Sequence, residues 1–107
     1  MIGIIGAMDE EVAMLKEKLE GKDVVIVRSG IGKVNAAMCA QILADVYHAD
    51  HVINTGIAGS LKAEINIGDI VLSTDALQHD MDAQAFGYEP GQIPRVDTLS
   101  FKADEKM

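Results

Sequence analysis

Carboxylates crowd the point where an apolar run gives way to a helix-forming segment. The stretch "IIGAMDEEV", residues 4–12, reaches Gly6 and then carries Asp9, Glu10 and Glu11 in succession. A glycine-containing turn from a strand into a helix usually binds an anion, so three acids there need an explanation. Successive helix residues point about 100° apart, so one acid can face the sheet edge while the others are solvated. A favourable helix N-terminus would also account for all three without any chemistry.

A second turn, "SGIGK" at residues 29–33, contains two glycines but matches neither common nucleotide-phosphate pattern. The P-loop pattern G-x-x-x-x-G-K needs a glycine where Val27 stands, and Asn35 occupies the third glycine position of G-x-G-x-x-G. A tight strand-to-helix turn is the simpler interpretation. Its backbone could still approach a ligand closely.

A third turn, "NTGIAGS" at residues 54–60, follows another apolar run. By itself it indicates only a turn. In a parallel sheet, however, the turns after Ile5, Arg28 and Thr55 would all open at one edge. Open α/β sheets bind ligands at that edge, so the coincidence favours a ligand site.

A histidine and two aspartates, His79, Asp80 and Asp82, invite a metal interpretation. Their spacing matches no common ligand pattern and no second histidine is nearby, so we predict no metal. We interpret His48 and His51, at a helix end and a strand start, as structural.

The composition narrows the class of protein. The 107 residues suffice for one domain, 49% are hydrophobic, and 9 Lys+Arg against 17 Asp+Glu give a net charge of -8. Such a surface repels phosphate backbones, which argues against nucleic acid. No apolar stretch approaches the roughly 18 residues of a membrane span, and the N-terminus lacks a basic signal region. With a single cysteine, Cys39, these features predict a cytoplasmic protein with no membrane partner.

The elements that must position these turns alternate along the chain. Apolar runs and helix-type periodicity predict strands at 2–6, 23–28, 51–55 and 65–73, helices at 9–20 and 33–48, an irregular loop at 75–100 and a further helix from 101. Asp9 could cap the first helix. This order predicts an α/β fold with a mainly parallel sheet.

The number of helices presents a packing problem. Strands this apolar need cover on both faces, and the second helix, also apolar, should be largely buried. Only two full helices are predicted. Either a partner subunit covers the rest of the sheet, or residues 1–107 form a single, truncated part of a larger α/β domain.

Six blocks carry a resemblance: "IGIIGAMDEEV", "SGIGKVNAA", "VINTGIAGSL", "IGDIVLS", "HDMDAQAFGYEPGQIP" and "FKADEKM". In this order they resemble the N-terminal half of bacterial 5'-methylthioadenosine/S-adenosylhomocysteine nucleosidases, of the purine nucleoside phosphorylase superfamily. The resemblance implies a phosphorylase/hydrolase-like mixed sheet flanked by helices and a homodimer. It implies hydrolysis of the N-glycosidic bond of either adenine thionucleoside, a step of methionine salvage and the methyl cycle, with no metal or cofactor.

The resemblance also assigns roles to individual residues. The family's water-activating carboxylate falls on Glu11, which suits hydrolysis because water must attack an oxocarbenium-like sugar. The substrate-binding positions fall on Ala7, Met8, Ile31, Ile57, Ala83, Phe86 and Pro94. Relatives often carry serine in place of Ile57, so a polar side-chain contact is expected to be absent there. Phe86, with Ala83 and Pro94, should reach a neighbouring subunit's pocket and cover the alkylthio end.

Two departures from the family leave alternatives open. Relatives carry a strand hairpin where only Gly21 and Lys22 separate the first helix from the second strand, and they continue for as long again after Met107. That second half supplies the aspartate that protonates adenine and the glutamate that grips the ribose. We therefore predict that the chain alone is inactive or nearly so. A nucleoside phosphorylase, favoured by Arg28, and a non-catalytic remnant that binds adenine nucleosides or dimerises are the alternatives.

Overall fold

The computed structural model describes all 107 residues, which divide into two compact units, Met1–Leu61 and Lys62–Met107. The first unit contains a three-stranded sheet and two helices, whereas the second has only short elements. A single domain over residues 1–107 stays a prediction.

The first unit is built on a parallel sheet, as the sequence predicts. Its strands are β1 (Ile2–Gly6), β2 (Val24–Arg28) and β3 (His51–Asn54), in the order β2-β1-β3. Both pairings of β1 are parallel, and Ile4 lies opposite Ile26 on one side and Ile53 on the other. The carboxyl ends of all three strands therefore meet at one edge of the sheet.

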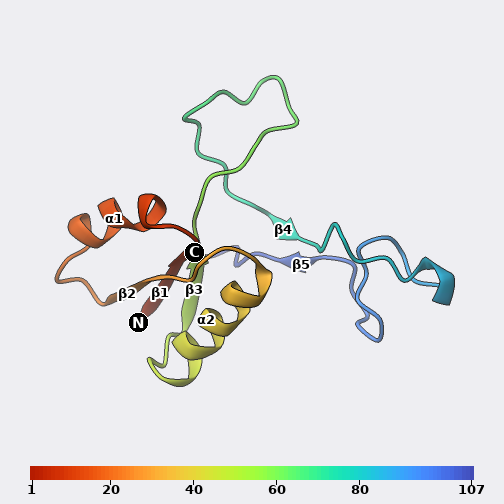
Figure 1. Ribbon diagram of the computed structural model, residues 1–107, viewed down its shortest axis with the longest axis horizontal. Coiled ribbons are helices and arrows are strands. Elements are labelled where there is room, and N and C mark those ends of the chain that lie inside the picture. The colour runs from red at the N-terminus through yellow and green to blue at the C-terminus, as the bar shows by residue number, and fades with distance from the viewer. The chain divides into compact units, whose positions relative to one another are not determined.

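Two helices cover this sheet on opposite faces (Figure 1). They are α1 (Asp9–Lys18) and α2 (Lys33–Asp45), and both end earlier than predicted. Right-handed connections force this arrangement, because the chain moves from β1 to β2 on one side and then crosses to β3 on the other. Gly3 lies against Leu43 of α2, and Gly6 lies against Val12 of α1. The large side chains of this core are Ile4, Ile5, Val12 and Leu43.

The outer face of α2 contradicts the prediction of a largely buried helix. Leu43 is its only buried residue, because the strands contact only a narrow stripe of the helix. A row of apolar side chains at four-residue spacing is exposed instead: Val34, Met38, Ile42 and Val46. β3 is exposed along its whole length, so the expected cover on both faces holds for β1 and not for β3.

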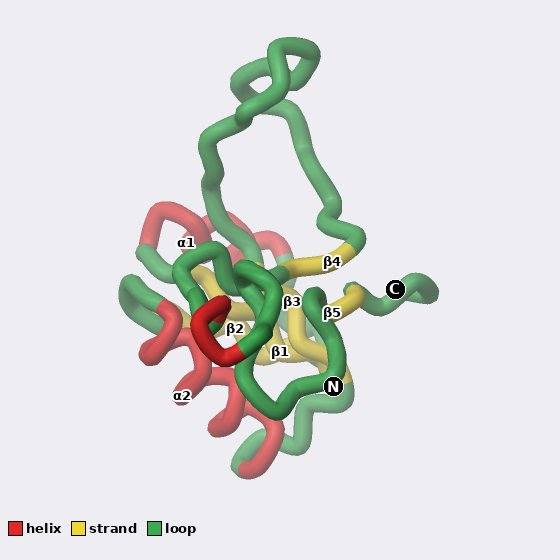
Figure 2. Tube along the Cα trace, turned by 90° about the vertical axis from the view of Figure 1, so that its right-hand side faces the viewer, coloured by secondary structure: helices red, strands yellow, loops and turns green.

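The second unit consists mostly of loop (Figure 2). Its elements are the antiparallel pair β4 (Asp75–Ala76) and β5 (Phe101–Lys102) and the 3-10 helix η1 (Gln84–Phe86). The irregular loop predicted for 75–100 is thus largely confirmed. The predicted helix from Phe101 is wrong, because Phe101 pairs with Ala76 and the chain continues without helical structure.

The strand predicted at 65–73 is also wrong. Its first part closes a tight turn, in which the N–H of Asn66 donates to the Asp69 carboxylate at 2.8 Å and Gly68 has φ +93°. Ile70, Val71 and Leu72 follow with exposed side chains and no partner strand. An apolar run forms a strand only where another strand pairs with it. No helix in the structure combines the length and apolar character needed to cross a bilayer.

Candidate active site

The turns after the first two strands are tied together at the carboxyl edge of the sheet. The N–H of Ser29 donates to the carbonyl of Gly6 at 2.9 Å, and the N–H of Thr55 donates to the carbonyl of Ile5 at 2.8 Å. The second bond ties the turn after β3 to the same strand. The prediction that all three turns open at one edge is confirmed.

The carboxylate of Glu11 lies between two of these turns. The N–H groups of Ala7 and Met8 donate to its Oε2 at 2.6 and 3.0 Å, and the N–H of Ile57 donates to its Oε1 at 3.3 Å. Ile57 is 46 residues away in sequence, so the side chain links the start of α1 to the turn after β3. Met8 rather than Asp9 occupies the N-cap position, and the predicted Asp9 cap is wrong. The helix start is capped instead by the side chain of Glu11, at the third helical position, which accepts from the N–H of Met8, as in a capping box.

These donors control the charge of Glu11. The N–H of Met8, followed by those of Ile57 and Ala7, lowers the pKa of the carboxyl below its ordinary value of 4.5, against partial desolvation that raises it. Hydrogen bonds from N–H groups favour the ionised form of a carboxyl. Glu11 is therefore an anion at neutral pH.

The other two acids of the trio behave differently. Asp9 and Glu10 are exposed, and Arg28 Nη1 donates to Asp9 Oδ2 at 3.2 Å. The expectation that one acid faces the edge while its neighbours are solvated is confirmed. The exposed arginine has an aspartate as its partner rather than an open anion site.

A depression of about 280 Å³ opens beside Glu11. Its lining residues are Met8, Glu10, Glu11, Thr55, Gly56 and Ile57. The structure thus brings together Met8, Glu11 and Ile57 of the predicted set, with Ala7 contributing its N–H. Ile31 lies in the turn after β2 with its side chain 74% exposed and does not line the depression.

Two lining residues, Thr55 and Gly56, were not among the predicted site residues. A Cβ added at Gly56 would lie 3.0 Å from Glu11 Oε1, so the backbone there passes directly against the carboxylate. The small residues of "NTGIAGS" were the only sequence signal for this approach.

Three predicted substrate-binding residues belong to the second unit. Ala83 is buried there, Phe86 ends η1 with its side chain 84% exposed, and Pro94 is exposed in the following loop. Their expected contact with a neighbouring subunit's ligand stays a prediction.

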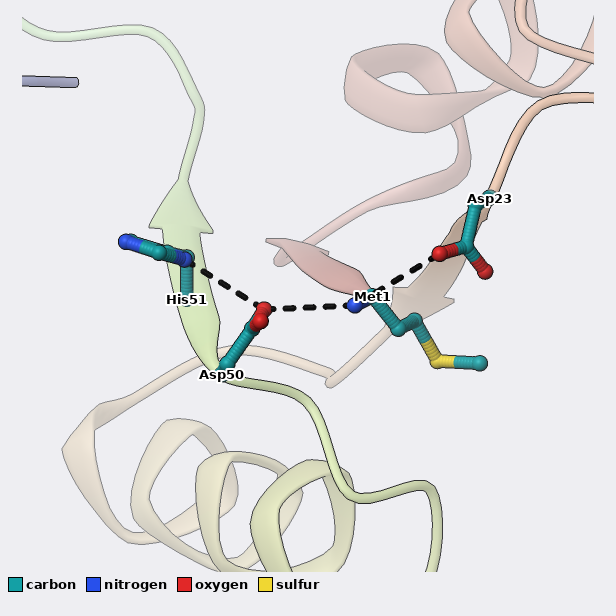
Figure 3. Close-up of polar contacts among 4 residues, drawn as sticks. All are labelled: Met1, Asp23, Asp50 and His51. Atoms are coloured by element: carbon teal, nitrogen blue, oxygen red, sulfur yellow. Dashed lines mark hydrogen bonds and ion pairs between the residues drawn. The ribbon is translucent and has the colours of Figure 1, made fainter.

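The opposite, amino edge of the sheet holds a different polar cluster (Figure 3). The Met1 ammonium lies 3.2 Å from Asp50 Oδ1 and 3.5 Å from Asp23 Oδ2, and His51 Nδ1 lies 3.3 Å from Asp50 Oδ1. His51 thus has the structural contact that its position suggested. No three His, Cys, Asp or Glu side chains anywhere in the structure are grouped to hold a metal ion.

Comparison with known protein families identifies the class of protein. A profile of the phosphorylase superfamily matches residues 16–107, so the chain belongs to that superfamily. Within it, the chain is similar to 5'-methylthioadenosine/S-adenosylhomocysteine nucleosidases. It is 44% identical over 124 aligned residues to the nucleosidase of Geobacillus sp. (strain WCH70), covering 99% of this chain and 53% of that relative.

Solved structures show the same similarity. The nucleosidase of Colwellia psychrerythraea in complex with adenine has a TM-score of 0.91 and 46% identity over 97% of this chain and 50% of its own. The S. pneumoniae enzyme with the transition-state inhibitor MT-ImmA has a TM-score of 0.92 and 40% identity, over 98% of this chain and 53% of its own. The α/β fold with a parallel sheet flanked by helices is thus confirmed. The chain spans about half the length of these relatives.

Proposed function

We propose that Glu11 activates water for hydrolysis of the N-glycosidic bond of 5'-methylthioadenosine or S-adenosylhomocysteine, with release of adenine. One observation carries the proposal: an ionised carboxylate is held by three backbone N–H groups at the side of a depression on the carboxyl edge of the sheet. The similarity to nucleosidases, including one that binds adenine, supports the choice of bond.

In this reaction the water oxygen attacks C1' as the bond to adenine breaks, and the sugar passes through an oxocarbenium-like state. Glu11 accepts one proton of the water, and the electrons of the broken bond leave with adenine. Adenine must then gain a proton. The family resemblance assigns that step to an aspartate in the half of the relatives that this chain does not match. We therefore expect the chain alone to release adenine very slowly or not at all.

Two features of the site, an ion pair of Arg28 and the acidic lining of the depression, favour hydrolysis over phosphorolysis. Arg28, the cation that could have held phosphate, is paired with Asp9 at 3.2 Å. Glu10 and Glu11 both line the depression, and two carboxylates repel a phosphate at short range. A phosphorylase would need a net positive site here, which the neighbouring side chains do not provide.

Adenine release from 5'-methylthioadenosine tests the proposal, measured by chromatography at high protein concentration over hours. Any release by the parent chain is expected to be slow, independent of phosphate and abolished by Glu11→Gln. Release that requires phosphate supports a phosphorylase instead. Equal adenine release from the parent chain and Glu11→Gln contradicts the proposal that Glu11 activates water.

Ligand binding without turnover distinguishes the remaining alternative. A ligand that binds only the folded chain raises its melting temperature. If 5'-methylthioadenosine stabilises both the parent chain and Glu11→Gln equally while neither releases adenine, residues 1–107 by themselves bind the nucleoside without catalysis. A homodimer, which the resemblance implies, is tested by sedimentation.

A further inference from the structure

The carboxylate of Glu11 has one hydrogen-bonding position that its protein donors leave open. A carboxylate accepts about four hydrogen bonds, two at each oxygen. Oε2 accepts two, from the N–H groups of Ala7 and Met8, whereas Oε1 accepts one long bond from Ile57. A water molecule that binds Glu11 therefore has room at Oε1 and not at Oε2.

Gly56 lies against this same oxygen. A Cβ at position 56 would lie 3.0 Å from Oε1, 3.4 Å from Cδ and 3.7 Å from Oε2 of Glu11. The first distance is shorter than an ordinary van der Waals contact. Since Oε2 is anchored by two N–H groups, a side chain at position 56 should displace chiefly Oε1, the oxygen that accepts from Ile57, by a few tenths of an ångström.

We propose that Gly56 is a positioning residue, whose missing side chain keeps Oε1 of Glu11 bonded to the Ile57 N–H and open to water, so that Oε1 is the oxygen that takes the proton. The assignment of the proton rests on the proposed function of Glu11. The placement of the carboxylate by Gly56 does not, and it can be tested without turnover.

The same loop offers a matched control. Gly59 is three residues further on, and a Cβ added there would meet nothing within 4 Å. Neither glycine has φ in the left-handed region, so alanine introduces no backbone strain at either position. Gly56→Ala and Gly59→Ala thus differ mainly in contact with Glu11.

The test is a carbon-13 titration of the Glu11 carboxyl in the full 107-residue chain, for the parent and both variants. Gly56→Ala is expected to raise the pKa of Glu11, because displacing Oε1 weakens the Ile57 hydrogen bond that lowers it, and to shift the Ile57 amide proton toward an unbonded position. Gly59→Ala should leave both unchanged. An unchanged Glu11 pKa in Gly56→Ala, or an equal change in Gly59→Ala, overturns the proposal.

A second measurement needs no variant. In the parent chain, the Ile57 amide resonance should follow pH with the same midpoint as the Glu11 carboxyl, because the two groups share a hydrogen bond. An Ile57 amide that ignores this titration overturns the proposal even if Gly56→Ala fails to fold. If both measurements give the expected result but Glu11→Gln leaves adenine release unchanged, the proposed function fails while the placement of the carboxylate by Gly56 stands.

Discussion

The two edges of one three-stranded sheet hold carboxylates in contrasting ways. At the amino edge, Asp23 and Asp50 share the Met1 ammonium, so one positive charge offsets part of their negative charge. At the carboxyl edge, only backbone N–H groups contact Glu11, and no cationic side chain contributes to its pKa. An acid held by neutral donors keeps its net charge, whereas an acid in an ion pair does not. The carboxyl edge therefore presents a carboxylate without a counter-charge beside the depression, whereas the carboxylates of the amino edge link the starts of the three strands.

The largest difference should appear when one charge is removed from each edge. Glu11→Gln is expected to lower whatever adenine release the parent chain shows by about 100-fold or more, the usual contribution of a general base, because an amide cannot accept the proton. Asp50→Asn should leave release unchanged. Chromatography of adenine measures both, and glutamine suits the third helical position, so the cap is retained. Equal losses in the two variants would remove the distinction between the edges.

The two glycines of β1, Gly3 and Gly6, allow the effect of core packing to be measured apart from the effect on Glu11. A Cβ at Gly3 would lie 2.8 Å from Leu43 Cδ1, and one at Gly6 would overlap Val12 Cγ1, so alanine at either position overpacks the core. Each substitution should cost about 1–3 kcal/mol of unfolding free energy, measured in urea.

Only Gly6→Ala should also disturb the carboxyl edge, because its Cβ would lie 3.3 Å from Glu11 Cβ. The carbon-13 titration of Glu11 should therefore change in Gly6→Ala and not in Gly3→Ala. A change in both would mean that the core, rather than the local turn, positions the acid.

The dependence of stability on pH should differ between the edges. Folding lowers the pKa of Glu11, so its contribution is present above the ordinary value of 4.5 and is lost as the pH falls through the folded value. Folding raises the pKa of the Met1 ammonium, chiefly through Asp50, so that contribution is present below 8.0 and is lost as the pH rises through the folded value.

Raising the pH from about 7 to about 10 should thus weaken the amino edge alone. The effect is expected to be small because both aspartates are exposed. Urea midpoints of the parent and Asp50→Asn should converge at alkaline pH, whereas those of the parent and Glu11→Gln should not. Convergence of the second pair would show that the two edges are coupled.

The smallest effect is expected at Arg28. It pairs with Asp9 on the surface, with side chains 57% and 72% exposed, and such pairs contribute about 1 kcal/mol or less. Arg28→Gln should change the urea midpoint little and leave adenine release insensitive to phosphate. A large loss of release, with phosphate dependence in the parent, would assign the arginine to an anion site.

Sequence patterns predicted the first unit well because its elements are specified locally. The apolar runs of β1, β2 and β3 and the helical periodicity between them predicted the element types and the parallel sheet, but not the strand order β2-β1-β3. The second unit was predicted poorly at residues 65–73. Apolarity identified that run, but a strand also needs a partner, which no local pattern reveals.

The candidate site, like the fold, was predictable only in part from the sequence. Spacing alone indicated that one of three acids would face the edge, and the structure identifies it as Glu11. Gly56 and Ile57 contact that acid only because the turn after β3 lies beside the start of α1, although Glu11 and Ile57 are 46 residues apart in sequence. Only the register of β1 against β3 determines that, and register is not visible in a sequence without its partner strand.

The backbone hydrogen bonds to Glu11 affect which substitutions the chain tolerates around it. Because Ala7, Met8 and Ile57 contribute N–H groups rather than side-chain atoms, any amino acid except proline preserves the donor at these positions. Substitutions at these positions can therefore change the surface around the depression while the Glu11 carboxylate stays where it is.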